Sequence, residues 1–245
     1  MTTAEPAICV EGLTKTYRRK VAVAELSLQV APGETVGILG ANGAGKTTTV
    51  EMIAGLRAPD RGRVRVLGLD PRRDRAQVRQ VLGVQLQEAY LHGALRVGEL
   101  VELYRSFYPR PRPGDELIEM VGLGEHLRTP FEKLSGGQQQ RLSIALALAG
   151  RPRALILDEL TTGLDPQGRR RIWSAIEQLK RDGVTILLVS HAMEEVERLC
   201  DRVALLDAGR LRALGTPQDL IDLAGTGSLD DAFVALTGTD LEDAA

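Results

Sequence analysis

One glycine-rich segment of the chain has the residue types that bind a polyphosphate. It reads GANGAGKT from Gly40 to Thr47, between an apolar run and a stretch whose apolar residues have helical spacing. Glycines have no Cβ atom, so backbone N–H groups in such a loop can surround a phosphate. The helix that follows adds partial positive charge at its N-terminus, Lys46 can reach the outer phosphates, and the Thr47 hydroxyl suits magnesium. The segment predicts a nucleotide-binding loop.

A second segment, LSGGQQQR from Leu134 to Arg141, places a serine and two glycines at the start of a helical pattern. Ser135 can cap that helix, and a helix N-terminus with free backbone donors can bind an anion. The sequence therefore predicts a second anion-binding helix start, although a chain with one nucleotide loop does not need two.

Two carboxylates end an apolar strand shortly afterwards. The strand reads ALILDE, from Ala154 to Glu159. An acid at the end of a core strand can hold magnesium, and the next acid can orient or deprotonate the water that attacks a phosphate. Asp158 and Glu159 are therefore candidate groups for phosphoryl transfer.

The elements that position these motifs follow from hydrophobic periodicity and from turn residues. We expect strands over Ala7–Leu13, Ala24–Val30, Val36–Leu39, Val81–Gln87 and Ala154–Glu159, and helices over Thr48–Leu56, Gly98–Phe107, Asp115–Val121 and Gly137–Ala149. LTKTYRRKVA is expected as the turn between the first two strands. This mixture predicts an α/β fold with a helix-rich segment in the middle of the chain.

The sequence pattern alone does not assign a role to three side chains. Tyr17 precedes the phosphate loop and is either an exposed tyrosine or a ring that stacks on a purine base. Gln85 and Gln87 lie on the same face of one expected strand, so alternation cannot separate them.

Four of the eight aromatic residues fall within one short stretch, as Tyr90, Tyr104, Phe107 and Tyr108. Their spacing fits a helix that packs its own core. The alternative is an apolar groove for a partner element, because aromatic residues are enriched at interface cores.

Composition restricts the classes of function. A length of 245 residues with 43% apolar residues allows one large α/β domain or one core with an inserted subdomain. A net charge of −2 gives no general positive field toward nucleic acid or anionic lipid, and nucleic-acid binding is not expected. Cys9 and Cys200 have no metal-ligand spacing, and no run approaches the roughly 18–20 apolar residues that span a bilayer. A soluble chain is expected.

The motifs together resemble the ATP-binding cassette (ABC) ATPase family in order and spacing. They are GANGAGKT, LSGGQ, ALILDE, TTGLDP from Thr161 to Pro166, and LLVSH ending at His191, and the match covers Ala7–Gly215. The resemblance implies an α/β P-loop NTPase core of the ABC type, with an antiparallel β subdomain and an inserted α-helical signature subdomain. It divides the chain into one ABC ATPase domain over residues 1–220 and a C-terminal helical tail over 221–245. Within that domain, 7–88 and 151–220 form the nucleotide-binding core with its β subdomain, and 89–150 the helical subdomain.

The resemblance also implies roles for single residues. Glu159 is similar to the catalytic base, His191 to the switch residue at the γ-phosphate, and Gln87 to the Q-loop glutamine, which leaves Gln85 as a strand residue. ATP contacts are implied for Tyr17, Gly40, Ala41, Asn42, Gly43, Ala44, Gly45, Lys46, Thr47 and Thr48. The implied magnesium contacts are Thr47, Gln87 and Asp158, the last through water. His92 and His126 match no family motif and are expected at the surface.

In this family two copies pack head to tail, which explains why the chain has a second anion-binding site at LSGGQ. The implied signature residues, which act on the ATP of the other copy, are Leu134, Ser135, Gly136, Gly137 and Gln138. Asp165 falls in the implied dimer-interface loop. The expected cofactors are ATP and Mg²⁺, and the expected partner is a second copy or a paired homologue. Leu160 departs from the family, which usually has proline there, so a less rigid turn after Glu159 is expected.

The resemblance further implies transport. The expected function is the energising subunit of an exporter for a drug, lipid or polysaccharide, on the cytoplasmic face of the membrane. A separate membrane permease is expected to dock near Gln87–Tyr108. The tail segments GTPQDL and SLDDAFVALTG resemble the multidrug (CcmA-like) exporter group. The alternative is a soluble ABC ATPase that acts on nucleic acid or ribosomes.

Overall fold

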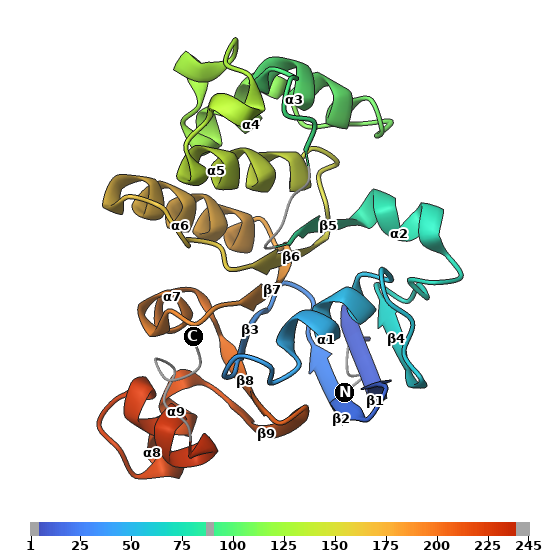
Figure 1. The fold of residues 1–245 in the computed structure, drawn as a ribbon, viewed down its shortest axis with the longest axis vertical. Coiled ribbons are helices and arrows are strands. Elements are labelled where there is room, and N and C mark those ends of the chain that lie inside the picture. Colours follow the sequence, from blue (N-terminus) through green and yellow to red (C-terminus); the bar gives the residue numbers. More distant parts are fainter. Residues whose placement is uncertain (1–4, 87–90, 239–245) are drawn as a thin grey trace.

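The structure, a computed structural model, describes residues 5–86 and 91–238. Two sheets organise this part of the chain, a three-stranded sheet in the order β2-β1-β4 and a six-stranded sheet in the order β5-β6-β7-β3-β8-β9. Figure 1 shows helices α3, α4 and α5 together at one end of the molecule and α8 and α9 at the other, with the strands between them. The mixed α/β class expected from the sequence is confirmed.

The three-stranded sheet is antiparallel. Strands β1 (Ile8–Tyr17) and β2 (Lys20–Val30) form a hairpin, and β4 (Arg61–Val66) pairs with β1 on its other side. The expected turn LTKTYRRKVA was wrong, because pairing continues up to Tyr17 and Lys20. Backbone pairing holds these polar positions in the hairpin, whereas apolar alternation marks only the part of a strand that faces a core.

The six-stranded sheet is parallel except at one edge. Its strands are β3 (Thr35–Leu39), β5 (Leu82–Gln85), β6 (Ala154–Asp158), β7 (Thr185–Val189), β8 (Arg202–Asp207) and β9 (Arg210–Gly215), with β9 antiparallel to β8. All residues of β3, β6 and β7 are buried, which explains their continuous apolar runs. The strand expected over Val81–Gln87 begins one residue later, since Val81 ends helix α2 (Arg75–Val81).

Helices pack on both faces of the parallel strands. α6 (Pro166–Arg181) and α7 (Met193–Leu199) belong to one hydrophobic cluster, and α1 (Lys46–Ile53) packs on the opposite face, in a second cluster with the small sheet. Helix α1 lies beside the small sheet, where it contacts β2 and β4. The phosphate loop between β3 and α1 is therefore held between the two sheets.

The middle of the chain is helical, as expected. It contains α3 (Val97–Arg105), α4 (Gly114–Val121) and α5 (Gly136–Ala147), with short 3-10 turns at Gly124–His126 and Phe131–Lys133. Buried side chains of these helices form one hydrophobic cluster with β6 and α6. The helical region is thus packed against the sheet through a continuous apolar core, and it positions the N-terminus of α5.

Two helices close the described chain, α8 (Pro217–Ala224) and α9 (Leu229–Thr237). They pack on each other and on β9, with Leu220, Leu229 and Phe233 buried. Among residues 5–86 and 91–238, no helix is both long and apolar enough to span a bilayer.

Candidate active site

The phosphate loop leads from buried strand β3 directly into α1, whose first residue is Lys46. The Lys46 ammonium donates hydrogen bonds to the carbonyl oxygens of Gly40 at 2.6 Å and Ala41 at 3.1 Å. Burial lowers the pKa of Lys46, while the nearby charges of Asp158 and Glu159 act in the opposite direction. The loop thus curls around its own lysine and brings the cation close to both carboxylates.

Two glycines allow this loop to fit between its neighbours. Gly45 has a φ of +98°, and a Cβ atom there would lie 2.3 Å from the carbonyl oxygen of Ala22 on β2. A Cβ at Gly40 would lie 2.5 Å from the carbonyl oxygen of Leu206 on β8. Any side chain at either position would displace the backbone of a neighbouring strand, so the glycine pattern serves packing as well as phosphate access.

Asp158 ends β6 and is almost fully buried, with 2% of its surface exposed. Burial and, secondly, the charge of Glu159 raise the pKa of Asp158 to about 6, against the opposing effect of Lys46. Its Oδ2 atom has no hydrogen-bond partner within the described residues. A buried acceptor without a donor next to a phosphate loop suits a cation or its coordinated water.

Glu159 follows in the left-handed region, with a φ of +53° that is uncommon for a residue with a side chain. Its N–H donates to the carbonyl of Val189 at 2.8 Å. The side-chain amide of Gln140, on α5, donates to the carbonyl of Glu159 at 2.9 Å. Leu160 is fully buried. Packing of Leu160 and the Gln140 bond support the turn in this conformation, and the less rigid turn expected from leucine stays a prediction.

His191 follows the end of β7 by two residues, and β7 pairs with the strand that ends in Asp158. Its Nδ1 atom is 3.8 Å from Oε1 of Glu159, and its side chain is 57% exposed against 21% for Glu159. Parallel strands β6 and β7 pair Asp158 with Val189, so both chain segments leave the sheet at the same edge. The sequence placed these residues in separate motifs, and the topology brings them together.

Ser135 caps α5 in the way expected from its sequence. Its Oγ atom accepts from the N–H of Gln138 at 3.3 Å, and Oε1 of Gln138 accepts from the N–H of Ser135 at 2.9 Å. Figure 1 shows α5 well separated from α1, with α6 and the strands between them. The cap and the phosphate loop of one copy are therefore two distinct sites.

His126, which was expected at the surface, contacts a residue of the signature helix. It is half-buried, and its Nε2 atom is 3.0 Å from Nε2 of Gln138. Gln140 was likewise missed as a contact of Glu159. Nothing in hydrophobic spacing indicates either contact, because both join positions 12 and 19 residues apart.

The remaining predicted residues have varied surroundings. The Tyr17 ring is 37% exposed, with the Arg57 guanidinium 5.2 Å from its centroid. A Cβ at Gly43 would lie 3.6 Å from the Lys20 ammonium, so the hairpin tip that carries Tyr17 lies beside the phosphate loop. Asp165 caps α6 by accepting from the N–H of Gly168.

Of the two glutamines that the sequence pattern could not separate, the structure describes only Gln85. Gln85 is buried, and its Oε1 atom accepts from the N–H of Asp158 at 3.2 Å, so it joins β5 to β6. Gln87 lies outside the described residues, as does Tyr90. The predicted metal contact of Gln87 therefore stays a prediction.

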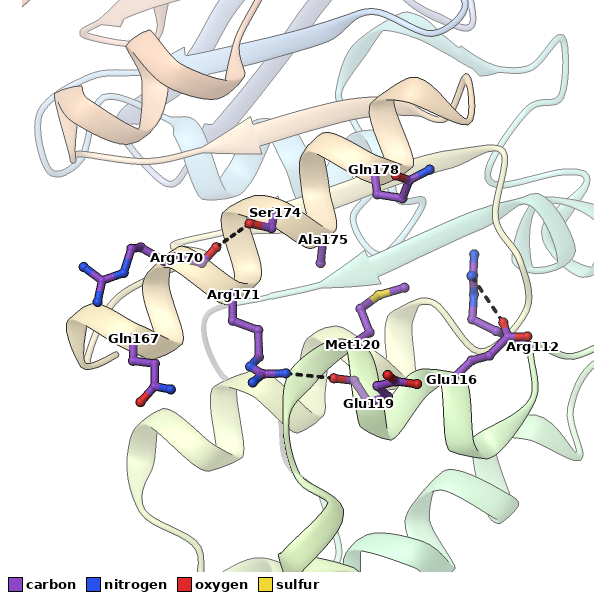
Figure 2. A pocket seen from close by; sticks show the side chains of 10 residues that line it. All are labelled: Arg112, Glu116, Glu119, Met120, Gln167, Arg170, Arg171, Ser174, Ala175 and Gln178. Carbon is purple, nitrogen blue, oxygen red and sulfur yellow. Dashed lines mark hydrogen bonds and ion pairs between the residues drawn. The ribbon is translucent and has the colours of Figure 1, made fainter.

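Two of the depressions away from these motifs border the helical middle of the chain. One of about 280 Å³ is lined by apolar residues that include Leu56, Leu86, Tyr104 and Tyr108. Phe107, 58% exposed, lies with its ring 5.8 Å from that of Tyr104. The other, of about 590 Å³, lies between α4 and α6, where Arg171 donates to the carbonyl of Glu119 at 3.2 Å (Figure 2).

Fold and site together define a P-loop ATPase cassette, and comparison with known proteins identifies the family. The ABC transporter family model matches residues 23–162. The linearmycin resistance ATP-binding protein LnrL of Bacillus subtilis (strain 168) is 37% identical over 239 residues, 96% of this chain and 76% of the relative. The Nod factor export ATP-binding protein I of Rhizobium etli is 41% identical over 221 residues, 88% of this chain and 70% of the relative.

A solved structure agrees in fold. It is the dimeric post-hydrolysis state of the ATP-binding cassette MJ0796 bound to ADP and phosphate, with a TM-score of 0.79 and 27% identity over 85% of this chain and 98% of that one. The chain belongs to the ABC transporter family. It is a nucleotide-binding subunit of the ABC ATPase type that hydrolyses ATP, and the resemblance of its motifs to this family is confirmed.

Proposed function

We propose that this ATPase drives an exporter by binding and hydrolysing ATP between two copies of the cassette. The observation that carries the proposal is the convergence of Lys46, Asp158, Glu159 and His191 at one sheet edge, while the Ser135 cap lies elsewhere on the same copy. The names of the relatives, which refer to linearmycin resistance and Nod factor export, support export over import. The cargo class is a drug, a lipid or a polysaccharide.

We assign the chemistry to the residues at this edge. Glu159 accepts the proton of the attacking water, His191 contacts the γ-phosphate, and Lys46 neutralises the outer phosphates. Because Nδ1 of His191 lies 3.8 Å from Oε1 of Glu159, a protonated His191 would also stabilise the Glu159 carboxylate. We assign the ATP contacts to Tyr17 and to the residues of the phosphate loop, as the family resemblance implies.

Mg²⁺ fits the same residues. The Thr47 hydroxyl and the carboxylate of Asp158, whose Oδ2 atom has no partner among the described residues, are hard oxygen donors of the type magnesium prefers. Within the described residues no cluster of three His, Cys, Asp or Glu side chains forms a metal cage, which is consistent with an ion that is held mainly by phosphates. When bound, Mg²⁺ supplies charge neutralisation at the phosphates.

The signature residues Leu134 to Gln138 act on the second copy in this proposal. The capping box orients the start of α5 and leaves further backbone N–H groups of its first turn for a phosphate. ATP then becomes part of the interface, and its hydrolysis loosens the dimer. The dimeric MJ0796 structure, which contains ADP and phosphate, supports this arrangement. We place Asp165, which caps α6, in the interface loop.

A membrane permease docks on the apolar depression in the same proposal. Leu56 is 64% exposed and Phe107 58% exposed, beside the half-buried Tyr104, so large apolar side chains surround a concave site. Tyr108 lines the same depression, and its ring also packs against the core near Gly150, where a Cβ would lie 2.3 Å from it. Docking here holds the ATPase on the cytoplasmic face.

We assign 89–150 as the helical subdomain, 7–88 and 151–220 as the core, and 221–245 as the tail.

Co-expression with a candidate membrane permease subunit tests the proposal. We expect the membrane subunit to stimulate ATP hydrolysis and Leu56→Ser/Phe107→Ser to remove that stimulation while ATP binding persists. A matched control, Leu223→Ser/Val234→Ser, changes two exposed apolar residues on α8 and α9 and should keep full stimulation. Stimulation by DNA or ribosomes, with none by a permease, would overturn the transport assignment.

A further inference from the structure

Positive charge is concentrated in one segment of a chain that is acidic overall. Residues 57–79 contain eight arginines and three aspartates, with no lysine or glutamate, while the whole chain has a net charge of −2. Net charge alone therefore conceals a strongly basic region. Such a region acts on partners within about a Debye length, roughly 10 Å at 0.1 M salt, whatever the total charge.

Strand β4 presents three of these arginines on one face. Arg61, Arg63 and Arg65 alternate with residues that include the buried Val64 and Val66, and all three arginines are exposed. Because successive side chains of a strand point to opposite faces, the guanidinium groups share the solvent face of the small sheet. β4 is an edge strand of this sheet, next to β1.

The loop after β4 adds two more arginines to the same place. Arg72 and Arg73, both exposed, line a depression of about 570 Å³ together with Arg63 and Arg65. We call Arg61, Arg63, Arg65, Arg72 and Arg73 the arginine patch. The side chain of Arg63 is 80% exposed and that of Arg73 is 86% exposed, so the charged ends are available to a partner.

The carboxylates of the segment are occupied by local donors. Asp60 accepts from the Lys15 ammonium at 2.8 Å and from the N–H of Thr16 at 2.7 Å. Asp70 accepts from the N–H groups of Arg72 at 2.9 Å and Arg73 at 3.2 Å. These bonds hold both carboxylates in place in their ionised form, and the Lys15 cation offsets the charge of Asp60.

Two carboxylates do approach the patch itself. Glu11 lies 3.4 Å from Nε of Arg63, and Asp70 lies 3.8 Å from Nε of Arg73. Exposed ion pairs of this kind contribute at most about 1 kcal/mol and are easily exchanged for another anion. Five arginines therefore outnumber the two carboxylates that pair with them, which leaves net positive charge on this surface.

The patch continues toward the proposed permease site. The loop with Arg72 and Arg73 leads into α2, where the Gln80 amide donates to the carbonyl of Phe107 at 3.4 Å. Phe107 stands beside the apolar depression that we assign to the permease. One short helix therefore separates the arginine patch from the site nearest the bilayer.

We propose that the arginine patch binds the anionic phosphate headgroups of the membrane next to the permease. Guanidinium groups pair with phosphate oxygens through two parallel hydrogen bonds, and clusters of four to eight basic residues bind anionic leaflets. Exposed arginines spread over an edge strand and the loop after it can each pair with a different headgroup. The orientation rests on the proposed permease contact, whereas headgroup binding by the isolated chain does not.

Co-sedimentation of the isolated chain with vesicles tests the proposal. We expect binding to vesicles with about 30% phosphatidylglycerol, little binding to pure phosphatidylcholine, and a loss of binding as salt rises from about 50 to 300 mM. Arg63→Gln/Arg72→Gln/Arg73→Gln should weaken the binding at least about tenfold. Arg170→Gln/Arg181→Gln/Arg210→Gln removes the same charge from exposed positions on α6 and β9 and should keep it.

Unchanged ATP binding by both triple variants verifies that they fold. Equal loss of vesicle binding in the two variants would overturn the patch, since it would mean a general charge effect. Equal binding to anionic and neutral vesicles would also overturn it. Tighter binding to duplex DNA than to anionic vesicles would assign the patch to nucleic acid instead. None of these outcomes depends on whether the cassette drives an exporter, so failure here leaves the proposed function standing.

Discussion

The side-chain amide of Gln140 donates a hydrogen bond of 2.9 Å to the backbone carbonyl of Glu159. The bond joins the helix that begins with the signature to the residue that we assign as the base. Glu159 has a φ of +53°, a conformation that costs free energy and persists only when its surroundings hold it. Gln140 therefore positions the turn that carries the catalytic carboxylate.

Removal of this donor should lower turnover more than substrate binding. We expect Gln140→Met, which keeps the length of the side chain, to reduce kcat about tenfold with little change in KM for ATP. Gln140→Glu should reduce it further, because a carboxylate would face a carbonyl. Steady-state ATPase kinetics measure both, with Gln167→Met on the exposed side of α6 as the control. A normal kcat in both Gln140 variants would show that the contact has no role in catalysis.

His126 should act as an acceptor for the signature glutamine. Oε1 of Gln138 accepts from the N–H of Ser135, so its NH₂ group faces His126, and Nε2 of His126 must be unprotonated to accept. We expect His126→Phe to weaken ATP-driven dimerisation about fivefold, the effect of one hydrogen bond, and His126→Gln to restore it.

Light scattering of variants that also contain Glu159→Gln gives the dimer constant. His92→Phe is the matched control, because it removes the other histidine of the helical region. If His126→Phe dimerises like its parent, the contact does not position the signature.

Asp158 should lower the stability of the protein at neutral pH. Burial raises the pKa of its carboxyl from 3.8 to about 6, so the folded state keeps a proton that the unfolded state releases between these values. This contribution to stability is complete below about pH 4 and is lost as the pH rises to about 6. Asp158→Asn avoids that loss, and we expect it to be more stable than the parent by roughly 1–3 kcal/mol above about pH 6.

Urea unfolding in the presence of a chelator measures this difference from pH 4 to pH 8. Glu194→Gln, which changes a carboxylate with a 71% exposed side chain, should show no such pH dependence. Equal stability of Asp158→Asn and the parent across the range would mean that the carboxyl is not strained by burial. The same variant should have little ATPase activity, since it loses the proposed magnesium contact.

The sequence indicated most of the framework, and its limits have physical causes. Buried strands such as Ala154–Asp158 and the capped helix at Ser135 follow from periodicity and from turn residues. The hairpin tip near Tyr17 did not, because backbone pairing extended two strands through polar residues. Hydrophobic periodicity indicates which residues of a strand face a core. It does not indicate backbone pairing between polar segments.

Sequence patterns predicted less of the site than of the fold. Glycine spacing and the acidic strand end indicated Lys46 and Asp158, because each motif has a local mechanism. The proximity of His191 to Glu159 depends on strand order, and the contacts of Gln140 and His126 depend on how α5 packs. Such contacts join distant parts of the chain, so no window of sequence contains them.

The central claim is that the phosphate loop of one copy and the signature of the other form a single ATP site. Complementation in the Glu159→Gln background tests it most directly, because this variant should hold ATP without turnover. Two further variants, Lys46→Ala and Ser135→Arg, each disable one half of the proposed site. We predict that neither forms an ATP-dependent dimer alone in gel filtration, and that their mixture does, since it contains one intact composite site. A mixture that stays monomeric, while the Glu159→Gln parent dimerises with ATP, would contradict the account.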